Sequence, residues 1–230
     1  MFGLKYTWQD ALPIAKESSL EALNDYSSTL YKETFLEAMV YGDFKETDAR
    51  KAEQIFRRKT KTKAVERDQV FDITYLQFDQ PETIQYANKL KVNNSCFFRK
   101  YYIGQDSPEV RAAANIISKA LQQPFYTEMR TNQQLGYIVW SYVRNLDQDH
   151  YLNFLIQSGV YPADELDKRA NDFLNTAPKI LKEMGQENYQ RLIDSAIEEL
   201  EKKPMSISER AGKLKTLIFE YEADYQRDKK

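Results

Sequence analysis

The stretch that decides the fold reads QQPFYTEMRTNQQLGYIV and occupies residues 122–139. Its first part continues a helical pattern, its middle is a polar turn, and its end alternates like a strand. Arg130 and Tyr137 lie on either side of the turn. If the turn holds them together, a guanidinium and a phenol form a donor pair for a carbonyl, a carboxylate or an oxyanion. On the residues alone, an ion pair of Arg130 with Glu128 beside an ordinary strand tyrosine is the simpler interpretation.

Strands and helices are predicted in blocks around this stretch. Before it, a strand over residues 95–103 leads to a helix that starts at residues 106–109, with an Asp or Ser cap and a proline in the first turn. After it, two alternating runs, 137–143 and 151–158, predict an antiparallel hairpin joined by the polar connection 144–150.

Helices are also predicted to close the chain, over residues 163–184, 187–202 and 208–221. Pro124 and Pro178 are expected to bend or interrupt the helices that contain them. Because strands and helices come in blocks rather than in strict alternation, the predicted fold class is α+β, with a mostly antiparallel sheet packed with helices.

The first part of the chain predicts a helical segment over residues 8–30, a strand over 33–44 and a helix capped by Thr47. The basic run 57–63 is interpreted as a solvated linker, because the whole chain is acidic and no aromatics interleave the run. We place a domain boundary between residues 62 and 63. Beyond it lie two further strand-like runs, residues 70–78 and 83–91.

Composition excludes several classes of protein. The 230 residues carry 33 Lys and Arg against 35 Asp and Glu, so there is no net basic field to hold nucleic acid. A single cysteine and a single histidine exclude an internal disulfide, a CxxC-type zinc site and both HExxH and HxxEH. The seven scattered glycines exclude GxGxxG and a P-loop. No run approaches the ~18 apolar residues of a membrane span. We expect a soluble protein, cytoplasmic or periplasmic, and the compartment stays open.

His150 is the first of the weaker site candidates. It lies in the polar connection beside Asp147 and Asp149, a combination that can hold an adventitious metal ion. A solvated loop histidine is the favoured interpretation. The exposed aromatics around this hairpin also suit an extended peptide that adds a strand to the sheet.

Cys96 and two serines are further weak candidates. Cys96 begins a strand and is interpreted as a small buried hydrophobic residue. Ser141 and Ser158 have no base at hand in the sequence, so a serine hydrolase is not expected. The acidic helix near the end of the chain is interpreted as a solvated face with Glu198, Glu199 and Glu201.

The segment 129–139 resembles the signature of the last domain of the M16 zinc metallopeptidases, the insulinase family that includes pitrilysin and insulin-degrading enzyme. Residues 93–96, 101–102 and 154–158 match the strands around that signature, and the turn at 202–204 also fits. The resemblance implies the LuxS/M16 type of metalloenzyme repeat.

This resemblance also implies an organisation. Residues 1–62, of which 25–44 resemble a closing helix and strand, would be the C-terminal portion of the preceding repeat. Residues 63–230 would be the last, non-zinc-binding repeat. In the family, two half-shells enclose a chamber whose zinc lies in the first domain, on an HxxEH motif and a distal Glu. Met1 is therefore expected to lie inside a longer protein.

By the same match, Arg130 and Tyr137 would reach into the active site, bind peptide substrate near the scissile carbonyl and, for Tyr137, stabilise the oxyanion. The chain would bind no metal itself, depend on zinc in an N-terminal catalytic half, and be inactive alone. An exposed apolar interface would favour self-association. The alternatives are a non-catalytic peptide- or protein-binding module on the same scaffold and a purely structural domain.

Overall fold

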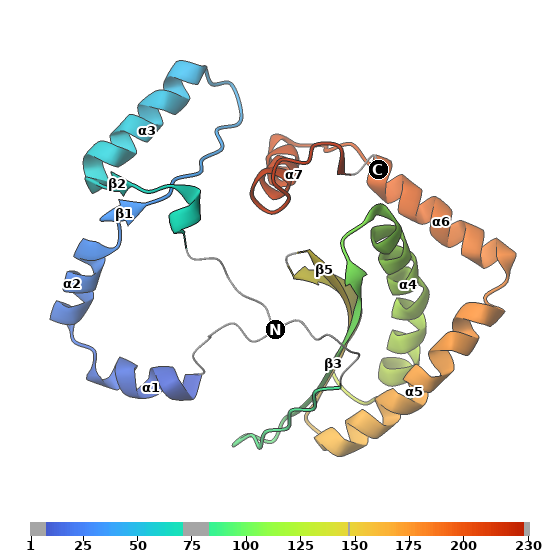
Figure 1. Ribbon diagram of the computed structural model, residues 1–230. Helices are drawn as coiled ribbons and strands as arrows, with labels where there is room; N and C mark the ends of the chain where they lie inside the picture. Colours follow the sequence, from blue (N-terminus) through green and yellow to red (C-terminus); the bar gives the residue numbers. More distant parts are fainter. Residues whose placement is uncertain (1–7, 71–82, 147, 228–230) are drawn as a thin grey trace. The chain divides into compact units, whose positions relative to one another are not determined.

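The computed structural model describes residues 8–70, 83–146 and 148–227 (Figure 1). The chain divides into two compact units, Met1–Tyr86 and Ala87–Lys230. The elements of the first unit are α1 (Trp8–Glu17), α2 (Leu20–Thr29), β1 (Glu33–Thr34), α3 (Glu46–Thr60), β2 (Lys63–Ala64) and a 3-10 turn, η1 (Arg67–Gln69). The boundary predicted between residues 62 and 63 falls inside this unit, and the assignment of 1–62 and 63–230 to two repeats stays a prediction.

The helical pattern over residues 8–30 forms two helices rather than one. The hydroxyl of Ser19 accepts a hydrogen bond from the backbone N–H of Ala22 at 3.1 Å, which caps the start of α2. Ser19 has extended backbone angles, as expected of an N-cap residue. The chain therefore breaks between α1 and α2 at a serine cap.

The strand predicted over residues 33–44 is wrong beyond its first two residues. β1 pairs in parallel with β2, and residues 35–41 have no regular secondary structure. A strand needs a neighbouring backbone to satisfy its N–H and C=O groups, and within the described residues β1 pairs with β2 alone. Val40, an apolar residue of this run, is 43% exposed.

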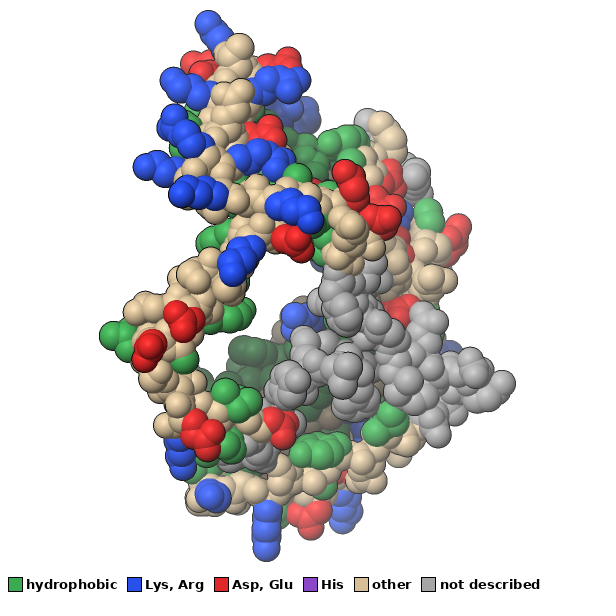
Figure 2. Space-filling view, turned by 60° about the vertical axis from the view of Figure 1, so that its left-hand side comes forward, with side chains coloured by type: hydrophobic (Ala, Val, Ile, Leu, Met, Phe, Trp, Pro, Cys, Tyr) green, Lys and Arg blue, Asp and Glu red, His purple; other side chains and the backbone are tan. Residues whose placement is uncertain are grey.

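The basic run 57–63 is helix and strand, so its interpretation as a linker is wrong. α3 continues to Thr60, and Arg57 is paired with Glu53 one turn earlier, at 2.8 Å between Nε and Oε1. Arginine and lysine favour helices, and positive charge near a helix C-terminus is stabilised by the helix dipole. Figure 2 shows Lys and Arg side chains gathered on the surface over α3.

The second unit is built on a three-stranded antiparallel sheet. β5 (Asp149–Ser158) lies in the middle, between β3 (Ser95–Gln105) and β4 (Ile138–Leu146). The register places Phe97, Ile156 and Val139 side by side on one face. All three are buried, which makes this face the core side of the sheet.

Helical elements make up the rest of the regular structure described in this unit, and the first three of them along the chain supply side chains to the core on that face. They are α4 (Pro108–Tyr126), the π-helical turn η2 (Thr127–Asn132), α5 (Ala163–Glu183), α6 (Gln186–Glu201) and α7 (Ile207–Phe219). Phe125 of α4 contacts Phe154 of β5 and Phe173 of α5 edge to face, with ring centroids 5.0 and 5.3 Å apart. Figure 1 shows α4 and α5 on the same side of the sheet. The predicted α+β class, a mostly antiparallel sheet packed with helices, is confirmed.

Several local predictions need correction. Residues 83–91 form no strand, and of the run 70–78 all but Val70 lies outside the described residues. Neither Pro124 nor Pro178 ends its helix. α4 buries Leu121 before its proline and Phe125 after it, and α5 buries Ala177 before its proline, with Ile180 partly buried after it. Tertiary packing of this kind outweighs the lost hydrogen bond.

The hairpin connection predicted over residues 144–150 is much shorter than expected. Asn145 pairs with His150 and Leu146 with Asp149, so both strands extend into the polar segment. Asp147 lies outside the described residues. Polar side chains made this segment resemble a loop, but a strand tolerates them where they find partners at its end.

Candidate functional site

The turn that carries the candidate pair is anchored by two fully buried side chains. Met129 of η2 and Leu135 have no exposed surface, and the backbone N–H of Leu135 donates to the carbonyl of Met129 at 2.9 Å. Both side chains belong to the core cluster of the sheet and helices. The segment between helix and strand is therefore fixed to the core at both ends.

Glu128 stabilises the same turn from its polar side. Its carboxylate accepts hydrogen bonds from the amides of Asn132, at 2.7 Å, and Gln133, at 2.8 Å. The bond from Gln133, followed by that from Asn132, lowers the pKa of Glu128 below its ordinary value. Glu128, the alternative partner of Arg130 in the sequence, is thus engaged by two amides of the turn.

Gly136 allows the chain to enter the sheet beside β5. A Cβ atom at this position would lie 1.9 Å from the backbone oxygen of Gln157, so no other residue fits without displacing the backbone. Gln134, two residues before it, has a left-handed φ of 53°. This backbone geometry fixes the position of Tyr137, which directly precedes β4.

Arg130 and Tyr137 are brought together on the surface. The guanidinium carbon of Arg130 lies 5.5 Å from the centre of the Tyr137 ring, within the range of a cation–π contact. Tyr137 is 85% exposed, and Arg130 is half-buried. The pair is thus neither sealed in the core nor split between the two faces of the sheet. It can offer guanidinium N–H groups and a phenol O–H to one acceptor.

We expect the variant Gly136→Ala to lower the free energy of unfolding by about 1–3 kcal/mol or more, because the added methyl group must push β4 away from β5. Gly212→Ala is the matched control, since a Cβ there meets nothing within 4 Å. Urea unfolding followed by circular dichroism measures both. Equal stability of the two variants would contradict the close approach at Gly136.

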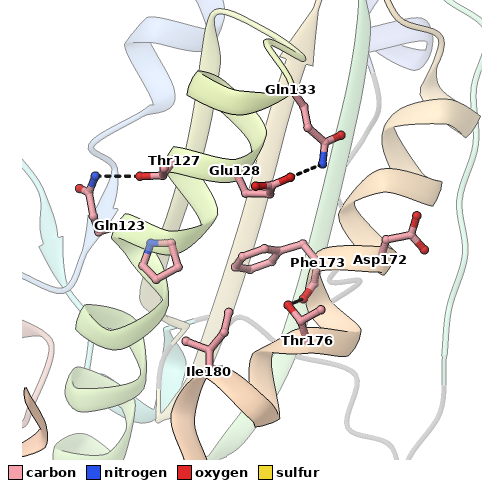
Figure 3. Close-up of a pocket in the computed structure, with 9 residues that line it drawn as sticks. Gln123, Thr127, Glu128, Gln133, Asp172, Phe173, Thr176 and Ile180 are labelled. Atoms are coloured by element: carbon pink, nitrogen blue, oxygen red, sulfur yellow. Dashed lines mark hydrogen bonds between the residues drawn. The ribbon is translucent and has the colours of Figure 1, made fainter. Parts of the chain in front are cut away.

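A separate groove lies between the end of α4 and α5 (Figure 3). It is open, has a volume of about 660 Å³, and has Glu128 and Asp172 among its lining residues together with Phe173 and Ile180. Neither Arg130 nor Tyr137 lines it. The groove and the pair of Arg130 and Tyr137 are therefore separate candidate sites.

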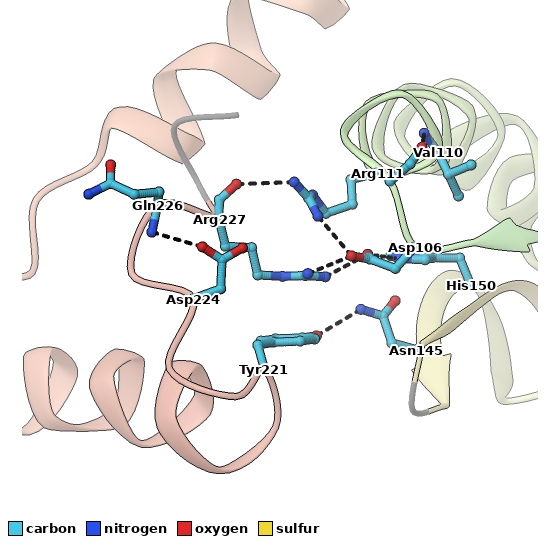
Figure 4. A network of polar contacts seen from close by, with 10 residues as sticks. Asp106, Val110, Arg111, Asn145, His150, Tyr221, Asp224, Gln226 and Arg227 are labelled. Carbon is cyan, nitrogen blue, oxygen red and sulfur yellow. Dashed lines mark hydrogen bonds and ion pairs between the residues drawn. The ribbon is translucent and has the colours of Figure 1, made fainter.

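His150 is buried, so its interpretation as a solvated loop residue is wrong. It is 4% exposed and lies in β5, with Nε2 at 2.6 Å from Oδ1 of Asp106 (Figure 4). A carboxylate accepts, so we assign the hydrogen to Nε2. Nδ1 has no hydrogen-bond partner among the described residues. Asp149 lies on the opposite face of the strand, so it does not join His150 in the weaker alternative, an adventitious metal site formed with Asp147 and Asp149.

Asp106 is the centre of a buried polar network that the sequence analysis did not predict. Besides His150, it accepts from Arg111 at 2.8 Å and from Arg227 at 2.6 Å. Burial alone would raise the pKa of Asp106, but hydrogen bonds from Arg227 and His150 and the charges of both arginines outweigh it and hold the pKa well below its ordinary value. The sequence showed this aspartate only as one of two caps for α4, and Ser107 is the cap.

The remaining candidates have structural roles or none. Cys96 is exposed, so its predicted burial is wrong, because the start of β3 turns it away from the core. Ser158 accepts from the backbone N–H groups of Val160 and Tyr161. Ser141 is buried, and its hydroxyl has no partner within the part of the chain that the structure describes. The α6 residues Glu198, Glu199 and Glu201 are all exposed, and Glu199 pairs with Lys119 at 2.8 Å.

No metal site is found in the described ranges. Over residues 8–70, 83–146 and 148–227, no group of three or more His, Cys, Asp or Glu residues is placed to hold an ion. Over the same residues, no helix is both long and apolar enough to cross a bilayer.

Comparison with known proteins finds a family profile and several relatives to which this chain is similar. The family profile "PQQ synthase PqqF-like, C-terminal lobe domain 4" matches residues 116–215, which include the turn and the hairpin. The chain is 26% identical over 234 aligned positions to insulin-degrading enzyme of Mus musculus, covering 99% of this chain and 23% of the relative. It is 24% identical over 220 positions to A-factor-processing enzyme of Saccharomyces cerevisiae, covering 93% and 21%.

A solved structure of pitrilysin has the same fold. It superposes with a TM-score of 0.73 at 18% identity and covers 98% of this chain and 24% of its own. The chain therefore spans less than a quarter of the length of each of these three relatives. The matched region resembles the C-terminal lobe domain that the profile describes.

Proposed function

Since this chain is homologous to the C-terminal part of the M16 zinc metallopeptidases, we propose that it is the non-zinc-binding C-terminal fragment of such an endopeptidase. In this proposal it walls the chamber and positions the peptide substrate near the scissile bond. The N-terminal half of the same protein holds the zinc and performs the hydrolysis, and this chain alone is inactive. The observation that carries the proposal is the joint presentation of Arg130 and Tyr137.

The two side chains suit a peptide carbonyl. Arg130 is permanently charged and presents several N–H donors in a fixed plane, while Tyr137 adds a single O–H. When a peptide bond is hydrolysed, negative charge develops on the carbonyl oxygen, so donors aimed at it bind more strongly in the transition state than before. The π-helical turn and Gly136 fix the backbone that carries the two groups, which limits the reorganisation that binding requires.

The exposure of Tyr137 also fits a role completed by a partner. A donor in open water gains little from a hydrogen bond, because water competes for it. A closed chamber would exclude that water and strengthen both hydrogen bonds. The pair is thus expected to work only when the other half of the protein covers it.

The test is reconstitution. The chain is mixed with the zinc-bearing N-terminal half of the same protein, and cleavage of an unstructured peptide is followed by mass spectrometry. We expect cleavage with both halves and none with this chain alone. If the halves form a complex by size-exclusion chromatography with light scattering and cleave nothing, the proposal fails.

A second candidate function is a non-catalytic peptide- or protein-binding module. It is favoured by one observation: β4, which begins directly after Tyr137, is an edge of the sheet formed by the described residues. Edge strands bind extended peptides through backbone hydrogen bonds. This candidate predicts peptide binding that is unchanged in Arg130→Ala and Tyr137→Phe, and no cleavage in the reconstitution assay.

A further inference from the structure

The segment that follows α7, residues 221–227, reaches back to the hairpin end of the sheet, and we name it the strap (Figure 4). Its last residue, Arg227, donates from Nη1 and Nη2 to the two oxygens of Asp106, each at 2.6 Å. This is a two-pronged arginine–carboxylate contact, the strongest geometry for such a pair. Arg227 is 8% exposed, so the contact is shielded from water.

Two further contacts attach the strap to the sheet and to α4. Arg111, in the first turns of α4, donates to the backbone carbonyl of Arg227 at 3.1 Å. Asn145, near the end of β4, donates to the hydroxyl of Tyr221 at 3.0 Å. The Arg227 guanidinium also lies 3.5 Å from the centre of the Tyr221 ring. Through Asp106 and His150 the strap is also connected to β5.

The strap holds an unfavourable backbone conformation. Glu222 and Ala223 have φ values of 49° and 61°, and neither is a glycine. Side chains other than glycine rarely adopt this left-handed region, because Cβ is then too close to the following carbonyl oxygen. Without its contacts the strap would relax these angles. The ion pair with Asp106 therefore favours the attached strap, whereas the backbone strain at Glu222 and Ala223 favours its release.

We propose that the strap is an ionic latch with a closed and an open state. In the closed state Arg227 is seated on Asp106 and fastens the start of α4 to the hairpin end of β4 and β5. In the open state the strap leaves as a unit, and those ends of the sheet and helix become free to open locally. The two fastened elements, α4 and β4, lead at their other ends to the segment that carries Arg130 and Tyr137.

Amide hydrogen exchange of the whole chain, followed by mass spectrometry, tests the latch. In Arg227→Gln we expect exchange to rise about tenfold or more at the hairpin end around Asn145 and His150 and in the first turns of α4, with the rest of the second unit unchanged. Tyr221→Phe, a milder change, should raise it about threefold at the same amides. Arg210→Gln, which removes an exposed arginine from α7, is the matched control and should change nothing there.

For a second variant the proposal predicts slower amide exchange rather than faster. Ala223→Gly removes the strain of the left-handed residue and should slow exchange of the amides of Ala223 and Asp224 about fivefold. The latch is overturned if Arg227→Gln leaves the hairpin end as protected as in the parent, or raises exchange uniformly over the unit. Faster exchange in Ala223→Gly would equally overturn it.

Discussion

Replacing Tyr137 with Phe should lower kcat/KM for peptide cleavage by the reconstituted assembly about 10²–10³-fold. The variant loses one hydrogen-bond donor to the charge that develops on the scissile carbonyl, and loss of one such donor costs about 3–4 kcal/mol of transition-state stabilisation. Tyr137 is 85% exposed in this chain, so the substitution should leave the unfolding midpoint unchanged. Steady-state cleavage of an unstructured peptide measures the effect.

Two further variants sharpen this prediction. Arg130→Ala should lower kcat/KM similarly, and Arg130→Lys should recover only part of the loss, because a lysine keeps the charge but not the planar fork of donors. Tyr189→Phe is the matched control, since Tyr189 is a partly exposed tyrosine on α6, outside the donor pair. Rates of Tyr137→Phe and Arg130→Ala that equal those of Tyr189→Phe would remove the pair from the mechanism.

Replacing Asp106 with Ala should lower the free energy of unfolding by about 3–5 kcal/mol, the cost of removing one partner from a buried charge network. The change leaves two arginines and the Nε2–H of His150 without their shared acceptor. Asp172→Ala, an exposed aspartate on α5, is the control and should change stability by less than about 0.5 kcal/mol. Urea unfolding compares the two. A loss below about 1 kcal/mol in Asp106→Ala would show that the network contributes little to stability.

We also expect the contribution of Asp106 to the free energy of unfolding to depend on pH. The folded pKa of Asp106 is held below its unfolded value of about 3.9. A depressed carboxyl pKa contributes stability that is present above the unfolded pKa and is lost as the pH falls towards the folded pKa. The difference in unfolding free energy between the parent and Asp106→Asn should therefore be larger at pH 6 than at pH 3. The same difference at both pH values would contradict the depressed pKa.

Local sequence patterns predicted the second unit well. The alternation of residues 151–158 gave the middle strand, and the Ser-Pro-Glu start at residue 107 gave α4, because both signals depend on neighbours in the chain. The residues around the turn do not by themselves predict the contact of Arg130 with Tyr137, because an ion pair of Arg130 with Glu128 is the simpler interpretation. The resemblance to the M16 family implies the pair, and the structure brings the two side chains into contact.

Features that depend on distant residues were not predictable in this way. Asp106 pairs with Arg227 across more than half of the chain, and no local pattern joins them. His150 resembled a loop residue because its polar neighbours hide a buried partner that precedes it by 44 positions. The prediction of a strand over residues 33–44 was wrong although its alternation is clear. Within the described residues the neighbouring strand is only two residues long, and the local pattern does not show this.

The central claim is that Arg130 and Tyr137 together bind peptide backbone beside a zinc ion supplied by another part of the protein. The most direct measurement is a structure of the reconstituted assembly with an uncleaved peptide, made inert by replacing the Glu of HxxEH in the N-terminal half. We predict the Arg130 guanidinium and the Tyr137 hydroxyl within about 2.7–3.1 Å of a peptide carbonyl oxygen at the zinc. A peptide bound at the zinc with both side chains facing solvent would contradict the account.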